Sequence, residues 1–164
     1  MAILQRNKIL IALIALILFF SYLASLILTS FGSVEVKTLR LDTQNNQYLI
    51  YDLYKPKIAS KENKAPFIAI IPGFQRSKEA LSNIAIELSR RGYVVALIDP
   101  YAQGLSSSSL STRAATTEGY GMFSLVEYVH SGAFEYVDID RIGATGHSMG
   151  CLLYTSDAAD ERRR

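Results

Sequence analysis

Residues 141–150 read Arg-Ile-Gly-Ala-Thr-Gly-His-Ser-Met-Gly, an apolar run that leads directly into a G-x-S-x-G pentapeptide. This pattern is typical of a buried strand that turns sharply into a helix and holds a serine hydroxyl at the turn. The turn brings the backbones of the strand and the helix close together. The residues two positions before and two positions after the serine must therefore be small. Gly146 and Gly150 stand there. The sequence therefore predicts Ser148 as a nucleophile with a positive φ, and the Met149 N–H as a donor to an oxyanion.

The order of the upstream segments supports this interpretation of the pentapeptide, which alone would arise by chance with a likelihood of roughly one in twenty. Alternating and continuous apolar runs predict strands, and i, i+3, i+4 spacing predicts helices. The expected elements are a hairpin over 34–41 and 48–54, a buried strand over 67–71, a helix capped by Ser77 and ending at 90–92, a second buried strand over 93–98, a helix over 118–130, and a strand over 141–145. The first helix is expected to bury Leu81, Ile84, Ala85 and Leu88. This alternation predicts an α/β fold with a mostly parallel sheet between helices.

Residues 34–150 resemble the α/β-hydrolase superfamily, and within it the dienelactone hydrolase, esterase and serine aminopeptidase-like branches. The most specific pieces are residues 140–150 and the stretch Ile71-Pro72-Gly73-Phe74. The resemblance implies that Ser148 is the nucleophile and that the Met149 N–H is the first oxyanion donor.

The second oxyanion donor is expected in the tight turn after the strand that ends at Ile71. Pro72 stands where the family usually has a histidine. Because the donor is a backbone N–H, Phe74 can still provide it, and Gln75 and Gly73 remain alternatives.

The rest of the family machinery is absent from this chain. In this fold the nucleophile is followed by an Asp or Glu and then by a His that serves as the base. No histidine follows Ser148, and we expect the two that precede it, His130 and His147, to be structural or solvated. The sequence therefore predicts an inactive fragment.

The carboxyl-terminal residues explain this absence. The stretch Cys151–Glu161 resembles the translation of a sequencing-library adapter. We therefore predict that residues 151–164 are a non-native tail and that the genuine gene continues past Gly150. Cys151 is the single cysteine, so the native sequence then carries no disulfide.

The amino-terminal end is apolar and predicts a retained membrane anchor over residues 1–32, followed by the truncated hydrolase domain over 33–150. The stretch from Ile9 to Phe31 carries no charge and would extend about 34 Å as a helix. A cleavable signal peptide and a buried core helix are the weaker alternatives. Arg6 and Lys8 precede the stretch, so the positive-inside rule places the N-terminus in the cytoplasm and the hydrolase domain outside.

The composition limits the classes of partner. A net charge of +2 and a pI near 8.6 are too mild for a nucleic-acid-binding chain. Four lysines between the hairpin and the next strand predict a solvated loop; they are Lys55, Lys57, Lys61 and Lys64. Asp99, at the end of a strand, is expected to have a supporting role at most.

These observations predict a membrane-anchored serine hydrolase that acts on an ester, or less readily an amide, through an acyl-enzyme. Its partners would be a small-molecule ester or peptide substrate and the lipid bilayer, with no metal and no cofactor. A non-catalytic binding module of the same fold is the alternative. A structural membrane protein with a chance pentapeptide would require the order of strands to be coincidence.

Overall fold

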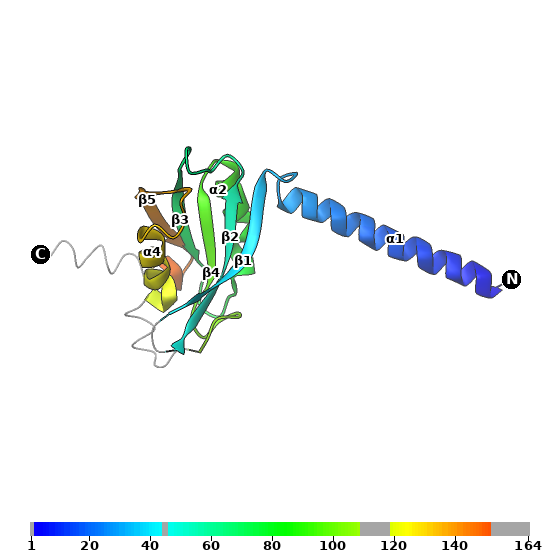
Figure 1. Cartoon of the computed structure of the whole chain (residues 1–164). Coiled ribbons are helices and arrows are strands. Elements are labelled where there is room, and N and C mark those ends of the chain that lie inside the picture. Colours follow the sequence, from blue (N-terminus) through cyan, green and yellow to red (C-terminus); the bar gives the residue numbers. More distant parts are fainter. Residues whose placement is uncertain (1, 44–45, 109–118, 152–164) are drawn as a thin grey trace, which may run out of the picture.

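One mixed sheet forms the frame of the molecule. The computed structural model describes residues 2–43, 46–108 and 119–151, and these contain five strands in one sheet (Figure 1). The strands are β1 (Val34–Asp42), β2 (Tyr48–Pro56), β3 (Ala65–Ile71), β4 (Val94–Asp99) and β5 (Val137–Gly146), in the spatial order β1-β2-β4-β3-β5.

The pairing of the strands confirms the predicted fold class. β1 and β2 form the expected antiparallel hairpin, with Val34 opposite Pro56 and Asp42 opposite Tyr48. β2 pairs with β4 in antiparallel orientation, and β3 runs parallel to both β4 and β5. An antiparallel pair therefore leads into a parallel group, as the alternating and continuous apolar runs predict.

Helices cover both faces of the sheet, which explains why β4 is buried along its whole length. On one face, Ala85 and Ile86 of helix α2 (Ser82–Arg90) pack with Val95 and Leu97. On the other, Leu125 and Val129 of helix α4 (Met122–His130) belong to the larger core, with Phe67 and Ile98.

The predicted start of the first covering helix is wrong. Ser77 precedes a short 3-10 helix, η2 (Lys78–Leu81), without a side-chain capping bond, and the α-helix begins only at Ser82. The buried positions of α2 are Ala85, Ile86 and Ser89, whereas Ile84 is 43% exposed. Of the four positions expected to be buried, Ala85 is buried and Leu81 and Leu88 pack, partly buried, against the core, so the expected spacing is wrong only at Ile84.

The second covering helix also begins later than predicted. Gly119–Gly121 form a short 3-10 helix, η3, and Gly121 has φ of 95° at the start of α4. Glycine reaches such a conformation without strain, so the backbone kinks there and α4 starts at Met122. Residue 118 lies outside the described part of the chain.

Helix α1 (Ala2–Leu28) projects away from the sheet and joins β1 through a tight reversal (Figure 1). Its segment Asn7–Ile27 is the one stretch among the described residues that is long and apolar enough to cross a membrane, and none of its most apolar window is buried against the rest of the chain. Ser30, Phe31 and Gly32 all have positive φ, and the last of these precedes β1 by two residues.

The two ends of the sheet have different roles. α1 enters where β1 begins and β2 ends, beside the start of β3, whereas the carboxyl ends of β3, β4 and β5 meet at the opposite end (Figure 1). Open α/β sheets bind their ligands outside the carboxyl ends of the strands. The site is therefore expected at the end far from α1.

Candidate active site

Ser148 lies at a sharp turn from strand to helix. β5 ends at Gly146, helical residues begin at Met149, and Ser148 between them has φ of 55°, as the pentapeptide predicts. The N–H groups of Gly150 and Cys151 donate to the carbonyls of His147 (3.0 Å) and Ser148 (2.9 Å), so the first helical turn closes on the serine itself. Ser148 is exposed.

The two glycines of the pentapeptide are required by the close approach of β3. A Cβ on Gly146 would lie 2.7 Å from the Ile71 carbonyl oxygen, and one on Gly150 would lie 2.5 Å from the same atom. The His147 N–H donates to that oxygen at 3.1 Å. Only residues without a side chain fit the two positions, for the steric reason inferred from the sequence.

The turn after β3 lies directly against the serine. A Cβ on Gly73 would be 3.3 Å from Ser148 Cβ and 3.3 Å from His147 Nδ1. The turn is closed by the Arg76 N–H, which donates to the Gly73 carbonyl at 3.2 Å, and Gln75 at its third position has φ of 55°. Phe74, the expected oxyanion donor, occupies the second position of this turn. The structure thus places the turn that carries Phe74 directly beside Ser148.

A hollow of about 600 Å³ opens beside this turn. Its walls are the turn after β3, the loop after β4 and the start of η3; they comprise residues 74–77, residues 101–104 and Tyr120. The side chain of Phe74 is 63% exposed at its rim. Three aromatic residues, Phe74, Tyr101 and Tyr120, give the hollow an apolar lining suited to the body of a small organic substrate.

Asp99 joins the two loops that form the hollow. Its carboxylate, 1% exposed, accepts the Lys78 N–H at 2.7 Å and the Leu105 N–H at 3.0 Å. Gly104 packs so closely on this carboxylate that any side chain there would overlap it. Two backbone donors compensate for the burial of the charge, so Asp99 fixes both walls of the hollow.

Lys78 completes this buried charge cluster. Its ammonium is 2.6 Å from Glu79 Oε1, 3.7 Å from Asp52 Oδ2 and 3.8 Å from Asp99 Oδ2. Burial alone would lower the pKa of Lys78, but the hydrogen bond with Glu79 and the charges of Asp52 and Asp99 outweigh it and raise that pKa. The bond from Lys78 lowers the pKa of Glu79 to about 2. These shifts keep Lys78 and Glu79 ionised at neutral pH, and the ion pairs of Lys78 hold the β3 side of the hollow in place.

The sequence did not identify the hollow. Tyr101, Gln103 and Tyr120 were not singled out, although Tyr101 and Gln103 follow directly on the strand that ends at Asp99. Gln103 Oε1 accepts the Arg76 N–H at 3.0 Å and so links the same two loops. Residues just after the carboxyl end of a strand often bind ligands in open α/β sheets, so their position in the sequence could have identified them.

The two histidines lie at different ends of the sheet. His147 adjoins the serine, with its ring against Gly73. His130 ends α4, which precedes the start of β5, whereas Ser148 follows the end of that strand. Ten residues of β5 span about 33 Å, so His130 is far out of reach of the Ser148 hydroxyl.

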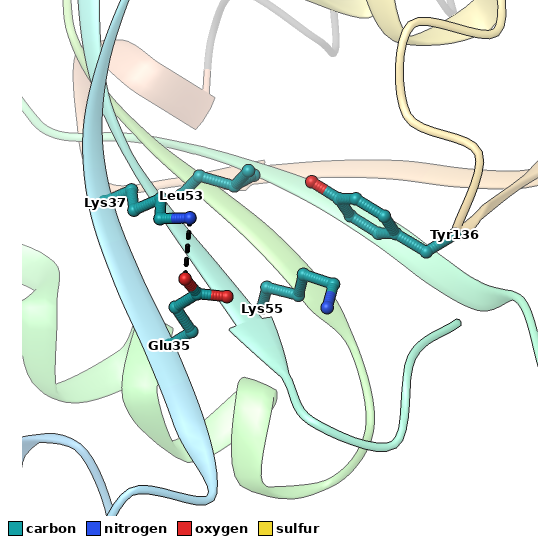
Figure 2. Close-up of a pocket in the computed structure, with 5 residues that line it drawn as sticks. All are labelled: Glu35, Lys37, Leu53, Lys55 and Tyr136. Carbon is teal, nitrogen blue, oxygen red and sulfur yellow. Dashed lines mark ion pairs between the residues drawn. The ribbon is translucent and has the colours of Figure 1, made fainter. Parts of the chain in front are cut away.

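A second hollow, of about 220 Å³, lies near the start of β1 and is lined by Glu35, Lys37, Leu53, Lys55 and Tyr136 (Figure 2). Lys37 Nζ pairs with Glu35 Oε1 at 2.6 Å, and this bond lowers the pKa of Glu35. The Lys55 ammonium lies 4.9 Å from the centroid of the Tyr136 ring, and burial raises the pKa of Tyr136 to about 12. These residues lie at the end of the sheet opposite Ser148, so they belong to a different surface from the candidate active site.

The sheet, the turn that carries Ser148 and the loops around it define the chain as an α/β hydrolase. Solved esterases and related hydrolases have a similar fold. The chain belongs to the PET hydrolase-like family, whose model matches residues 23–163. No curated protein matches the chain.

Three solved structures illustrate the similarity. They are DcsB in complex with its substrate analogue (TM-score 0.63, 23% identity), the esterase Pf2001 of Pyrococcus furiosus (0.60, 22%) and Est1E of Butyrivibrio proteoclasticus with bound ferulic acid (0.62, 24%). Each match covers 76% of this chain, but only 41%, 47% and 48% of the respective structure. At these identities the similarity establishes the fold, and the chain spans less than half the length of the three relatives.

Proposed function

We propose that this chain is the amino-terminal part of a membrane-anchored serine hydrolase that cleaves an ester, or less readily an amide, through an acyl-enzyme. Ser148 is the nucleophile, and the backbone N–H groups of Met149 and Phe74 bind the oxyanion. Residues 33–150 are the first half of the hydrolase domain. Residues 151–164 are a tail foreign to it, although the match to the family model extends to residue 163. The matching family is a hydrolase family, and the esterase Pf2001 has a similar fold.

The observation that carries this proposal is the conformation of Ser148. A positive φ is uncommon outside glycine and costs energy, so it persists only where the surroundings enforce it. Here Gly146 and Gly150 permit the turn, and the helix that begins at Met149 presents its amino-terminal end, with its partial positive charge, next to the serine. An exposed hydroxyl beside such a helix end is what acyl transfer requires.

The aromatic hollow supports an ester with an apolar or aromatic part as the substrate. Phe74 contributes both a backbone N–H to the proposed oxyanion site and a side chain to the hollow. A substrate whose carbonyl lies at Ser148 would therefore extend its body over Phe74 toward Tyr101 and Tyr120. This geometry favours hydrolysis over the alternative of a non-catalytic binding module, which needs no strained serine.

Active-site labelling tests the proposal. A fluorophosphonate probe is expected to label the longer protein at Ser148, and Ser148→Ala is expected to remove the label because no other hydroxyl has the same activation. Thr145→Ala, which changes a hydroxyl three residues away in β5, is the matched control and should retain labelling. If the folded longer protein is not labelled at all, the non-catalytic binding module is correct instead.

The proposed topology places the hydrolase domain outside the cytoplasm. Asn7–Ile27 extends about 31 Å as a helix, enough to cross the hydrocarbon core, and the cations Arg6 and Lys8 precede most of it. Protease added to intact cells is expected to cleave the domain without lysis. A domain that is digested only after lysis would contradict this orientation.

A further inference from the structure

Three segments that are distant in the sequence meet where α1 joins the sheet. The Arg90 guanidinium donates from Nη2 to the Ile27 carbonyl at 2.9 Å, and the Lys57 N–H donates to the Ser33 carbonyl at 2.9 Å. A Cβ on Gly92 would lie 3.6 Å from Ile58 Cδ1. The end of α1, the loop after β2 and the end of α2 therefore form one continuous surface. We call it the junction surface, and its outward side chains are Phe31, Lys57, Ile58, Arg90 and Arg91.

The junction surface combines exposed apolar side chains with cations. Phe31 is 75% exposed and Ile58 is 65% exposed, which is unfavourable in water for side chains of this size. Beside them stand Lys57, Arg90 and Arg91. Glu87 is the carboxylate nearest the arginines, at 3.2 Å from Arg90 and 3.1 Å from Arg91. Three cations and one carboxylate leave two net positive charges, and Glu35, beyond Lys57, already pairs with Lys37.

The depth of this surface follows from α1 itself. Ile27 is the last residue of the apolar span, so the Arg90 guanidinium bound to its carbonyl lies at the boundary between hydrocarbon and headgroups. Headgroup layers are about 5–8 Å thick on each side of the hydrocarbon core. Phe31 follows Ile27 by four residues, and the chain reverses at Ser30, Phe31 and Gly32. The Phe31 N–H donates to the Leu26 carbonyl at 2.6 Å, and the Val34 N–H donates to the Thr29 carbonyl at 3.1 Å, so the chain turns back here and Phe31 stays within this layer.

We propose that the junction surface rests on anionic phospholipids, with Phe31 and Ile58 among the upper acyl groups and Lys57, Arg90 and Arg91 at the phosphates. Aromatic and aliphatic side chains flanked by cations are the combination that binds peripheral segments to such membranes. The inference rests on the proposed membrane anchor. The prediction of four lysines in one solvated loop was wrong for Lys55, which lies in β2 with its ammonium over the Tyr136 ring. Lys57 is in the loop but lies against the turn after α1, where a Cβ on Gly32 would be 3.7 Å from its Nζ.

Single-tryptophan reporters test this inference, because the chain contains no tryptophan. The full chain would be reconstituted in vesicles of phosphatidylcholine with about 30% phosphatidylserine, without brominated lipids, with lipids brominated near the headgroup for the two surface reporters, and with lipids brominated at the middle of the acyl chains for Phe19→Trp. Three reporters are compared: Ile58→Trp on the junction surface, Phe19→Trp within α1, and Leu105→Trp, a 66% exposed position after β4 at the far end of the sheet. Brominated lipids are expected to quench Ile58→Trp at least about threefold more than Leu105→Trp.

Charge reversal provides the matched variant. Adding Lys57→Glu and Arg91→Glu to the Ile58→Trp chain is expected to reduce its quenching to near that of Leu105→Trp and to leave Phe19→Trp unchanged. Quenching of Phe19→Trp alone, with Ile58→Trp no different from Leu105→Trp, overturns the inference and leaves the anchor standing. Failure to quench Phe19→Trp overturns the anchor instead. If the Ile58→Trp side chain is shielded from water more strongly as the protein-to-lipid ratio rises, and brominated lipids do not quench it, the surface binds a second copy of the chain. That result also overturns the inference.

Discussion

Fluorophosphonate labelling of the 164-residue chain at Ser148 is expected to be at least about 10⁴-fold slower than labelling of the longer hydrolase that we propose contains it. The serine hydroxyl becomes a strong nucleophile only when a base removes its proton. In the proposed mechanism that base is a histidine that follows Ser148, held by an Asp or Glu, and residues 149–164 include no histidine.

The two histidines of this chain do not replace the missing base. His130 is separated from Ser148 by the length of β5. His147 precedes the serine, and its ring is turned against the backbone of Gly73. We therefore expect the Ser148 turn of this chain to lack the base that the proposed mechanism requires.

The comparison needs a control for folding, because β5 pairs with β3 on one side only among the described residues, and an unpaired edge promotes aggregation. The longer protein with alanine at the histidine that follows Ser148 is the appropriate variant, since it keeps the complete sheet. It is expected to label as slowly as the 164-residue chain. Labelling of either one at the rate of the unaltered longer protein would show that Ser148 is activated by another group.

The sequence predicted the parts of the fold that depend on local pattern. The polar-apolar alternation of residues 34–41 and 48–54 specifies a two-sided hairpin, and the continuous apolar runs of β3 and β4 specify strands buried on both faces. The predicted first residues of the helices were wrong because the start of a helix depends on contacts with residues that are distant in the sequence. The Lys78 N–H is bound to Asp99, twenty-one residues away, and this bond holds a 3-10 turn where a regular helix was expected.

In the candidate site, too, the features set by local sequence could be predicted and those set by tertiary contacts could not. The turn at Ser148 is encoded by two glycines within five residues, so its conformation could be predicted. The hollow could not, because it arises where the loops after β3 and β4 meet and where Asp99 binds a backbone N–H from each. Asp99 was expected to have a supporting role at most. Its carboxylate does support the site, by binding the two loops together, and only the tertiary structure reveals this role.

Gly150→Ala is expected to lower the free energy of unfolding by about 3 kcal/mol, although alanine is the better helix former by about 1 kcal/mol. The reason is steric. The new Cβ would lie 2.5 Å from the Ile71 carbonyl oxygen and 3.0 Å from Ile71 Cγ2. Neither can retreat freely, because that carbonyl also accepts the His147 N–H and Ile71 is fully buried at the end of β3.

Gly143→Ala is the matched control for this prediction. Gly143 lies in β5 like Gly146, but the nearest atom to a Cβ there is the Phe67 carbonyl oxygen at 4.0 Å. With no clash, the loss of unfolded-chain entropy is expected to stabilise the protein by about 0.5 kcal/mol. Urea unfolding in detergent micelles, followed by tyrosine fluorescence, measures both variants against the unaltered chain. The two substitutions are identical in chemistry, so opposite signs can come only from the approach of β3 to the Ser148 turn. Equal effects would mean that the strand and the helix do not meet as closely as a strained nucleophile requires.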